Sequence, residues 1–508
     1  MSYRFWRASA TAALLCAGLA SIAGAALRGI EPEDFSRFAT LDELQVSPDG
    51  QWLAYTVSSA DPAADEAHSA LWLVDWSGRE HLQLTRGAKD VSAPRFSPDG
   101  RYIAYLETAA GAERPQIQLL DRRGGEARTL TQASGEIQSF EWSPDGRRMV
   151  LVVREDVALT PDAKTPPPLV IDALHFKQDR SGYRTAGQSQ RLQLLQVDSG
   201  GTTPLGDAGG EQDQPVWSPD GRSIAFTRTD VGNGVDGKQD LMLIDARAGA
   251  SARLLARVFV PNAQHLAFSP DGGRLAYLEG LEPRFNAYIA DQLRVRPVAG
   301  GDAQPIAASL DRAIQHYQWQ ADGRAILAVV EDDQSSYPLR IDLRSGKWQR
   351  LAAGPMSTLA LAQGGGHWAV LAADDHSAAE VHALETTGLR KLTAHNEALL
   401  AGLRLGAVED LSFASADGTT IHGMMVKPPG FVAGRAYATI LWIHGGPNGQ
   451  DEHSLLLDGY PLQFERQFLA GQGYVVLAVN YRGSSGRGAQ FLRQPHRLDF
   501  VVPHRLFA

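Results

Sequence analysis

The hydrophobic and polar positions of this chain follow a unit that recurs about every fifty residues. Each unit carries an aromatic residue or Val, then the tetrapeptide SPDG, then a short apolar segment. The tetrapeptide begins at Ser47, Ser97, Ser143, Ser218 and Ser269, a degenerate QADG begins at Gln320, and a weaker copy, QGGGHWAVLAA, begins at Gln363. Self-similarity at such a period is typical of repeat architectures.

The tetrapeptide has the chemistry of a tight turn. Pro presets φ at the first turn position, Asp tolerates the next and Gly accepts a positive φ, so SPDG predicts the turn of a β-hairpin. The following strand alternates apolar residues, such as Ile103 and Tyr105, and a second strand ending in Asp comes about twenty residues later, as at residues 117–121 and 241–245. Strand, hairpin, strand and turn at this spacing predict a β-propeller. The repeats resemble those of TolB-type propellers, and their number predicts seven blades.

Between the third and fourth copies the interval lengthens to 75 residues and contains Pro161 and three consecutive prolines at residues 166–168. This stretch predicts a blade insertion or an extended loop. Gly232, Gly234 and Gly237 form GxGxxG, but the next segment has a strand pattern and not the helix that a dinucleotide site requires. His265 and His316 each precede a repeat start by four residues, which favours packing within equivalent blades over metal binding.

From Val408 onward the pattern changes. Residues 413–430 predict a hairpin that leads to a Pro-Pro-Gly turn, and residues 438–447 form a continuous apolar run of the kind found in strands buried on both faces. Residues 461–470 predict a short helix ended by glycines, and residues 474–483 predict a second buried strand. Strand, helix and strand in this order predict the start of a parallel α/β sheet.

The composition excludes several classes of function. The 508 residues carry 48 Lys and Arg against 58 Asp and Glu, a net charge of −10, which argues against nucleic-acid binding. No HExxH and no good calcium loop occur, so we expect no metal and no cofactor.

Residues 1–25 predict a signal peptide. Arg4 and Arg7 flank an apolar run, and Ala23-Gly24-Ala25 offers small residues for cleavage. A retained membrane anchor is the alternative, disfavoured because the run is rich in Ala and interrupted by polar residues. We expect an exported protein, periplasmic or secreted, with no membrane span after cleavage. Cys16, the only cysteine, lies in this segment, where bulky Leu15 disfavours a lipoprotein, so the mature chain would hold no disulfide.

The second region resembles the prolyl oligopeptidase family of serine peptidases, in particular its exported dipeptidyl-peptidase and acylaminoacyl-peptidase branches. The resemblance rests on SADGT at residues 415–419, HGGP at residues 444–447 and NYRGSSGRG at residues 480–488, downstream of a propeller. It implies a mainly β chain: a seven-bladed β-propeller at residues 26–405, followed by an incomplete α/β-hydrolase domain at residues 406–508, atypical after about residue 490. The motif loops comprise His444, Gly445, Gly446, Pro447, Asn480, Tyr481, Arg482 and Gly483.

The resemblance also implies the chemistry. The family cleaves peptides by acyl transfer with Ser, Asp and His, and its propeller admits only peptides or unfolded polypeptide segments. By resemblance the backbone N–H of Gly446 is an oxyanion-hole donor; a tight turn without catalytic duty is the alternative. The 508 residues contain no GxSxG, and Ser484 and Ser485 lack its spacing, so they fit a loop better than a nucleophile.

The last residues do not supply the missing parts. His496 and His504 each lie beside Arg and near Pro without helical or alternating period, and neither is taken as a catalytic base. Catalytic Ser, Asp and His are therefore not identifiable, and we expect a truncated, inactive relative of a serine peptidase. A sequencing or gene-calling artefact that hides an active peptidase, and a non-catalytic propeller that binds peptides or proteins, remain as alternatives.

Overall fold

The structure is a computed structural model. It describes residues 27–86, 90–109, 111–112, 114–155, 171, 177–178, 182–183, 189–207, 209–229, 238–259, 266–280, 290–446, 448–455 and 462–494. Several features singled out in the sequence lie outside these residues. They are the predicted signal peptide, the GxGxxG glycines, His265, Pro447, His496 and His504.

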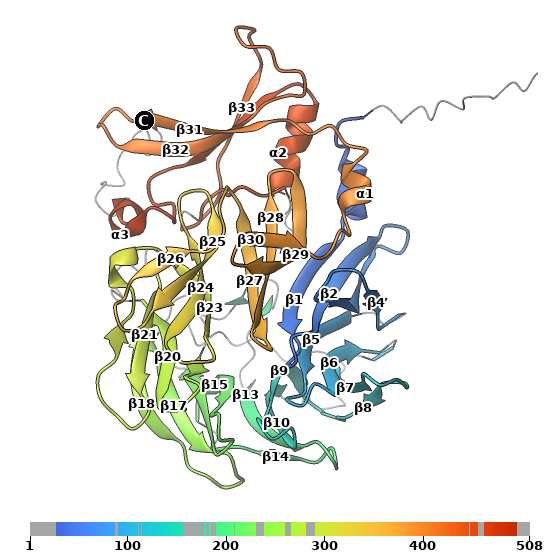
Figure 1. Ribbon diagram of the computed structural model, residues 1–508, viewed down its shortest axis with the longest axis vertical. Helices are drawn as coiled ribbons and strands as arrows, with labels where there is room; N and C mark the ends of the chain where they lie inside the picture. The colour runs from blue at the N-terminus through green and yellow to red at the C-terminus, as the bar shows by residue number, and fades with distance from the viewer. Residues whose placement is uncertain are drawn as a thin grey trace, which may run out of the picture.

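Seven four-stranded antiparallel sheets form a propeller, which confirms the number of blades predicted from the repeats (Figure 1). Numbered in chain order, blades 1 to 7 comprise β1 (Thr40–Val46), β2 (Trp52–Asp61), β3 (Glu66–Asp75), β4 (His81–Gln83); β5 (Asp90–Phe96), β6 (Tyr102–Thr108), β7 (Gln116–Asp121), β8 (Arg128–Thr129); β9 (Glu136–Trp142), β10 (Arg148–Glu155), β13 (Ser189–Gln196), β14 (Thr202–Pro204); β15 (Glu211–Trp217), β16 (Ser223–Thr229), β17 (Lys238–Asp245), β18 (Arg253–Phe259); β19 (Ala267–Phe268), β20 (Arg274–Glu279), β21 (Gln292–Pro297), β22 (Gln304–Pro305); β23 (Ile314–Trp319), β24 (Ala325–Glu331), β25 (Ser336–Asp342), β26 (Trp348–Arg350); and β27 (Ser357–Gly364), β28 (His367–Asp374), β29 (Ser377–Glu385), β30 (Gly388–Lys391).

The SPDG turns join the first and second strands of their blades, and one hydroxyl organises each of them. In blade 2 the Ser97 Oγ donates to Asp99 Oδ1 at 2.6 Å and accepts the backbone N–H of Tyr102 at 2.8 Å. The same two bonds recur in the other four SPDG turns, at 2.5–2.6 Å and 2.9–3.0 Å. The serine is therefore fixed by the turn and is buried in every copy.

The predicted alternation of apolar and polar residues after each turn is wrong. In β6 the consecutive residues Ile103, Ala104, Tyr105 and Leu106 are all buried, and the second strands of the other blades show similar continuous burial. Each blade stacks on a neighbour at both of its faces, so a central strand is covered from both sides. The strand predictions themselves, including the segment after GxGxxG that forms β17, are confirmed.

The propeller is closed by contact between blade 1 and blade 7. The hairpin Gly364-Gly365-Gly366 confirms the weak seventh repeat and lies on the SPDG turn of blade 1. A Cβ on Gly364 would lie 2.3 Å from the Ser47 carbonyl oxygen, and one on Gly365 would lie 2.4 Å from the Asp49 carbonyl carbon. Apolar residues of β1, β2, β28 and β29 share one core cluster across this junction.

The long interval is an insertion between the second and third strands of blade 3. β10 and β13 pair directly over eight residues, and the chain between them includes the small hairpin β11 (Lys177–Gln178) and β12 (Gly182–Tyr183). The prolines of this interval lie outside the described residues.

A further sheet, in the order β31-β32-β34-β33, lies on one side of the propeller (Figure 1). Its elements are β31 (Val408–Ala414), β32 (Thr420–Val426), β33 (Thr439–Trp442), α2 (Leu462–Gly471), β34 (Val475–Asn480) and α3 (Gly488–Leu492). β33 and β34 are parallel, which confirms the predicted strand, helix and strand. Helix α2 packs on the face that carries Val426 and Val476.

The prediction that residues 438–447 form a strand buried on both faces is wrong. Among the described strands β33 pairs with β34 alone, and Leu441 and Ile443 are 53% and 47% exposed. Among the described residues, nothing covers the sheet face opposite α2 at this edge strand. The apolar run was correctly assigned to a strand, but its burial depends on neighbours that a local pattern does not reveal.

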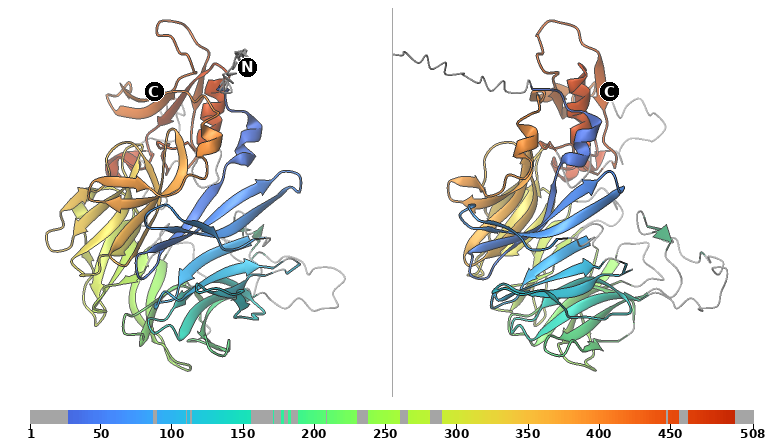
Figure 2. Two further views of the ribbon diagram at one scale, coloured as in Figure 1. Left: turned by 45° about the vertical axis from the view of Figure 1, so that its right-hand side comes forward. Right: turned by 90° about the vertical axis from the view of Figure 1, so that its right-hand side faces the viewer.

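The start of the described chain packs beside the second sheet (Figure 2). The 3₁₀ helix η1 (Pro32–Arg37) is preceded by Arg28, which pairs with buried Asp34 at 2.6 Å, and a core cluster joins Ile30 and Phe38 to Phe464 of α2. Two other short helices in the described ranges are η4 (Ala308–Leu310) and α1 (Glu397–Leu400). Within the described ranges, no helix has the length and apolarity to cross a membrane.

Candidate active site between the propeller and the second sheet

The two motif loops meet because they follow parallel neighbouring strands. The HGGP loop comes directly after β33, and the NYRGSS loop begins at the last residue of β34. The carboxyl ends of parallel strands lie at one sheet edge, the usual place for ligands in open α/β sheets. The sequence-predicted residues His444, Asn480, Tyr481, Arg482 and the glycines are thereby brought together, with Pro447 outside the described residues.

His444 is clamped between the two loops. Its Nε2 lies 2.9 Å from Ser484 Oγ, its Nδ1 lies 2.8 Å from the Gly445 carbonyl oxygen, and its ring stacks on Tyr481 at 4.6 Å between centroids. The Tyr481 hydroxyl donates to the His444 carbonyl at 2.7 Å. Ser484 is fully buried, and its contact with His444 holds the two loops together.

The backbone conformation at Gly446 disfavours any residue type other than glycine. Its φ is 127°, and a Cβ at this position would lie 2.7 Å from the backbone nitrogen of Asn448. Its neighbour Gly445 has no positive φ and would meet nothing within 4 Å. The residue is exposed, and no acceptor among the described residues bonds its backbone N–H.

Asn480 and Arg482 anchor the second loop. Asn480 Oδ1 accepts the Asp451 backbone N–H at 2.7 Å, and Asn480 Nδ2 donates to the Asp451 carbonyl at 3.1 Å. Buried Arg482 donates to Ser415 Oγ at 2.6 Å and to Asp417 in the SADGT turn. Hydrogen bonds from Thr419, with the nearby Arg482, hold the pKa of Asp417 at about 2. The SADGT and NYRG motifs thus form one unit through Arg482.

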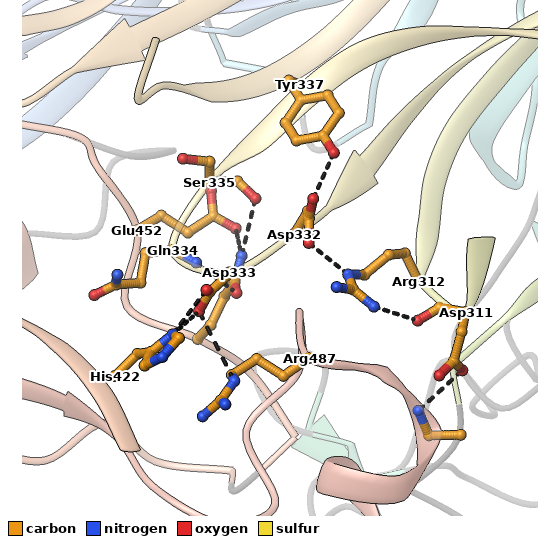
Figure 3. Close-up of polar contacts among 12 residues, drawn as sticks. Asp311, Arg312, Asp332, Asp333, Gln334, Ser335, Tyr337, His422, Glu452 and Arg487 are labelled. Carbon is orange, nitrogen blue, oxygen red and sulfur yellow. Dashed lines mark hydrogen bonds and ion pairs between the residues drawn. The ribbon is translucent and has the colours of Figure 1, made fainter. Parts of the chain in front are cut away.

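Blade 6 contacts this unit through its β24–β25 hairpin (Figure 3). The Asp333 backbone N–H donates to the Gly486 carbonyl at 2.9 Å, and the Asp333 carboxylate lies 2.7 Å from Nδ1 of His422 on β32. Gly486 has a φ of 78°, and a Cβ there would lie 2.9 Å from the Asp333 backbone nitrogen, so the chain needs glycine where it contacts the propeller. Asp333 and Gln334 both have positive φ.

Buried polar groups continue this contact behind the hairpin. The Glu452 carboxylate accepts hydrogen bonds from Ser336 Oγ at 2.9 Å, Ser357 Oγ at 2.6 Å and Gln450 Nε2 at 2.9 Å. It therefore joins the second region to blades 6 and 7. In the same hairpin, Asp332 pairs with Arg312 at 2.5 Å and accepts the Tyr337 hydroxyl at 2.5 Å.

Blade 7 makes a second junction around His453. Its Nδ1 lies 2.8 Å from Asp375 of the β28–β29 turn, and its Nε2 lies 3.0 Å from Asp410 of β31. Burial disfavours the charged imidazole, but the bond to Asp375 and the charge of Asp410 outweigh it, so the pKa of His453 is raised. Beside it, buried Arg466 of α2 pairs with buried Asp451 at 3.2 Å.

Two carboxyl groups near these junctions hold protons unusually strongly. Burial, followed by the charge of Glu452, raises the pKa of Glu331 to about 7, and burial raises the pKa of Asp291 to about 6. Gln315 Nε2 donates to Glu331 at 2.8 Å, whereas Asp291 Oδ1 has no hydrogen-bond partner among the described residues. Such shifts are a feature of functional sites as well as of buried structural groups.

We expect Glu331 to make the folded protein less stable as pH rises. Its folded pKa of about 7 exceeds the ordinary value of 4.5, so the folded chain keeps a proton that the unfolded chain has lost. The contribution of Glu331 to the free energy of unfolding is therefore greatest when the pH is below the ordinary pKa of 4.5. It falls as the pH rises from 4.5 to about 7 and is constant above the folded pKa. Glu331→Gln should raise stability at pH 8 by about 2 kcal/mol, after allowance for solvent screening, with little change at pH 4.

Thermal unfolding followed from pH 4 to pH 8 measures this effect. Glu279→Gln is a matched control because Glu279 ends the second strand of blade 5, as Glu331 does in blade 6, and pairs with Arg294 at 2.9 Å. Parallel pH profiles for the wild type and Glu331→Gln would contradict the assignment.

Sequence patterns missed the propeller side of this site. Asp333, Glu331 and Asp291 of the propeller lie in no recognisable motif, nor do Glu452 and His453, which contact it. Apart from the bond between Gln450 and Glu452, their contacts described above join residues that are far apart in the sequence. The closest sequence cue is the polar run DEHS that begins at Asp451 and is followed by three leucines. His316, one of the two blade histidines, is half-buried on β23, and among the described residues no group of three or more His, Cys, Asp or Glu is placed to hold a metal ion.

Comparisons with known proteins agree with this arrangement. A profile of the prolyl oligopeptidase family matches residues 460–499. The chain is 26% identical to the uncharacterized peptidase YuxL of Bacillus subtilis, covering 91% of this chain and 72% of the relative. It is 24% identical to dipeptidyl-peptidase 5 of Porphyromonas gingivalis, covering 92% and 69%.

Among solved structures, acylaminoacyl peptidase of Pyrococcus horikoshii superposes with a TM-score of 0.73 at 20% identity, covering 91% of this chain and 68% of that one. This likeness shows the same fold, a seven-bladed propeller with an α/β-hydrolase sheet. The SADGT, HGGP and NYRG motifs meet at one sheet edge. Their presence and the names of the relatives point to the same peptidase family. The chain therefore resembles the prolyl oligopeptidase family of serine peptidases, whose profile matches residues 460–499.

Proposed function

We propose that this chain holds peptides or unfolded polypeptide segments between the propeller and the second sheet, and that its 508 residues bind them without cleaving them. The observation that carries the proposal is the loop at Gly446. It is held by His444, Ser484 and Tyr481, it exposes a backbone N–H without a described partner, and no GxSxG occurs in the sequence to supply a nucleophile beside it.

In this proposal the Gly446 N–H is an oxyanion-hole donor of the ancestral reaction. A residue without Cβ lets a substrate carbonyl approach the backbone closely, and the hydrogen bond to that oxygen persists for a bound but uncleaved peptide. In this proposal Glu331 and Asp291, whose pKa values are raised by burial, belong to the propeller side of the binding region.

The proposal also covers organisation and location. We assign residues 1–25 to a cleaved signal peptide, residues 26–405 to the propeller and residues 406–508 to the hydrolase region, because blade 7 ends at Lys391 and the second sheet begins at Val408. The expected product is exported. Mass spectrometry of the mature amino terminus, expected at residue 26, tests the first boundary; an intact Met1 in the exported protein would contradict it.

The function is tested with an acetylated apolar tetrapeptide that lacks arginine. Fluorescence anisotropy should show saturable binding, whereas dipeptidyl and N-acetyl p-nitroanilides should not be hydrolysed and a fluorophosphonate should label no serine. Gly446→Ala should weaken binding about three- to tenfold through loss of one hydrogen bond and displacement of the loop. Gly445→Ala is the matched control and should bind as the wild type does.

Each outcome separates the hypotheses. Hydrolysis that the fluorophosphonate abolishes would show an active serine peptidase and overturn the proposal. Absence of any peptide binding would overturn it as well. If Gly445→Ala and Gly446→Ala weaken peptide binding equally, the Gly446 N–H does not contribute specifically to binding.

A further inference from the structure

The propeller uses arginine to fill the groove between certain neighbouring blades. In blade 3, Arg148 occupies the fifth position after the SPDG serine, stacks 5.0 Å above the Trp217 ring of blade 4, and donates to the Gly221 carbonyl at 3.0 Å and the Ala246 carbonyl at 2.7 Å. In blade 5, Arg274 occupies the same position. It stacks 4.9 Å above Trp319 of blade 6 and donates to the Gly323 carbonyl at 3.0 Å.

The junction of blades 2 and 3 has the tryptophan but lacks the arginine. The fifth position after Ser97 is Tyr102. Trp142 is the counterpart of Trp217 and Trp319, because each indole N–H donates to a carbonyl of the preceding blade's first strand, at 3.3, 3.2 and 3.1 Å respectively.

The missing arginine leaves the ring and a groove open. Trp217 and Trp319 are 9% and 4% exposed beneath their arginines, whereas Trp142 is only half-buried. Within the described part of the chain, no guanidinium or ammonium stacks on Trp142. A groove of about 390 Å³ lies between the two blades, lined by Tyr102 and Trp142 among others.

The groove keeps the acceptors that serve an arginine elsewhere. The Gly146 carbonyl is the counterpart of the Gly221 and Gly323 carbonyls, and no donor among the described residues bonds it. Asp99, Asp145 and Asp198 also line the groove. Bonds from their turn serines and the turn backbone lower the pKa of Asp99 and Asp145, so both carboxylates are charged at neutral pH.

Two neighbouring arginines already have partners, and neither covers Trp142. Arg101 pairs with Asp121 at 2.9 Å and stacks 4.6 Å above the Tyr102 ring. Arg128 lines the groove and donates to the Val197 carbonyl at 3.4 Å, which is the counterpart of the Ala246 carbonyl that Arg148 uses. The site therefore combines one open aromatic face, one open carbonyl and ionised carboxylates, the set that a guanidinium recognises.

We propose that the groove between blades 2 and 3 binds the guanidinium of an arginine side chain presented by a peptide segment. The occupant follows from the fold itself, which places arginine at the same position in two other junctions. The SPDG turns lie at the opposite end of the second strands from the hairpins that carry Asp333 and Asp375. This site is thus separate from the proposed peptide-binding space, and its test is independent of that proposal.

Calorimetric titration of the full chain with acetyl-Gly-Arg-Gly-amide tests the site. The citrulline peptide, which has the same shape without charge, should bind at least about tenfold more weakly, since stacking and charged hydrogen bonds are lost. Nα-acetylarginine amide separates two sources of the ligand: equal affinity indicates that the side chain alone is recognised, and weaker affinity indicates that the peptide backbone contributes.

The variant Tyr102→Arg copies the solution found in blades 3 and 5. It should fill the groove, abolish binding of the arginine peptide and leave the thermal midpoint unchanged or higher. Ser223→Arg is the matched control, because Ser223 holds the same turn position in blade 4, away from the groove, and should leave binding unchanged. Asp198→Asn, at an exposed position, should weaken binding about threefold and needs no repacking.

Equal binding of the arginine and citrulline peptides would overturn the proposal. Full binding by folded Tyr102→Arg would do the same. If Tyr102→Arg does not fold, Asp198→Asn decides: unchanged affinity in that variant, together with no citrulline discrimination, contradicts the site.

Discussion

Replacement of Gly365 by alanine should destabilise the propeller by about 2 to 5 kcal/mol, the sum of a left-handed backbone penalty and overpacking. Gly365 has a φ of 54°, and a Cβ there would lie 2.4 Å from both the Asp49 carbonyl carbon and the Gly50 nitrogen. These atoms belong to the backbone of blade 1 and cannot turn aside as a side chain does. In the Gly365→Ala variant, either the propeller opens between blades 1 and 7, or the SPDG turn of blade 1 and the hairpin of blade 7 both deform.

Gly366→Ala is the matched control. Gly366 has a φ of 84°, yet a Cβ there would meet nothing within 4 Å, so the substitution retains the backbone penalty of about 1 to 2 kcal/mol and lacks the collision. Denaturant unfolding of both variants measures the difference. Equal destabilisation would mean that blade 7 does not close the ring through this hairpin.

Arg466→Leu should cost about 3 to 5 kcal/mol, because it leaves the buried carboxylate of Asp451 without its cation. Both residues are 3% exposed, and Asp451 Oδ2 has no hydrogen-bond partner among the described residues. Asp375, which also acts on the pKa of Arg466, adds a second negative charge nearby. The loss should appear as a lower denaturant midpoint, accompanied by loosening of the contact between α2 and blade 7.

The double variant Arg466→Leu/Asp451→Asn distinguishes charge from packing. Removal of the orphaned charge should recover most of the lost stability, giving a coupling energy between the two positions. If Arg466→Leu/Asp451→Asn is as unstable as Arg466→Leu, the destabilisation comes from lost packing of the arginine side chain. In that case the ion pair does not stabilise the contact between α2 and blade 7.

The propeller could be predicted from sequence because its determinants are local. Ser97, Pro98, Asp99 and Gly100 form their own turn, and the repetition of such a turn reveals the architecture without knowledge of long-range contacts. The seventh hairpin departs from SPDG for a physical reason: its glycines accommodate the backbone of blade 1. Local pattern also assigned α2 and the parallel pair β33 and β34.

Burial and the propeller side of the site could not be predicted because they depend on contacts between distant segments. The apolar run of β33 has the composition of a buried strand, although Leu441 is half-exposed. His453 acquires a raised pKa only when Asp375 of blade 7 and Asp410 of β31 converge on it. In the motif loops, the sequence identified His444 and Ser484 as parts of loops but not as partners.

The measurement that tests the proposed function most directly is amide hydrogen exchange of the full chain with and without the saturating apolar tetrapeptide. We expect protection at residues 444–446, 480–486 and 332–335, where the motif loops face the blade 6 hairpin, and no protection at the SPDG turns. Protection confined to the propeller turns, or none at the motif loops under saturation, would contradict binding between the propeller and the second sheet.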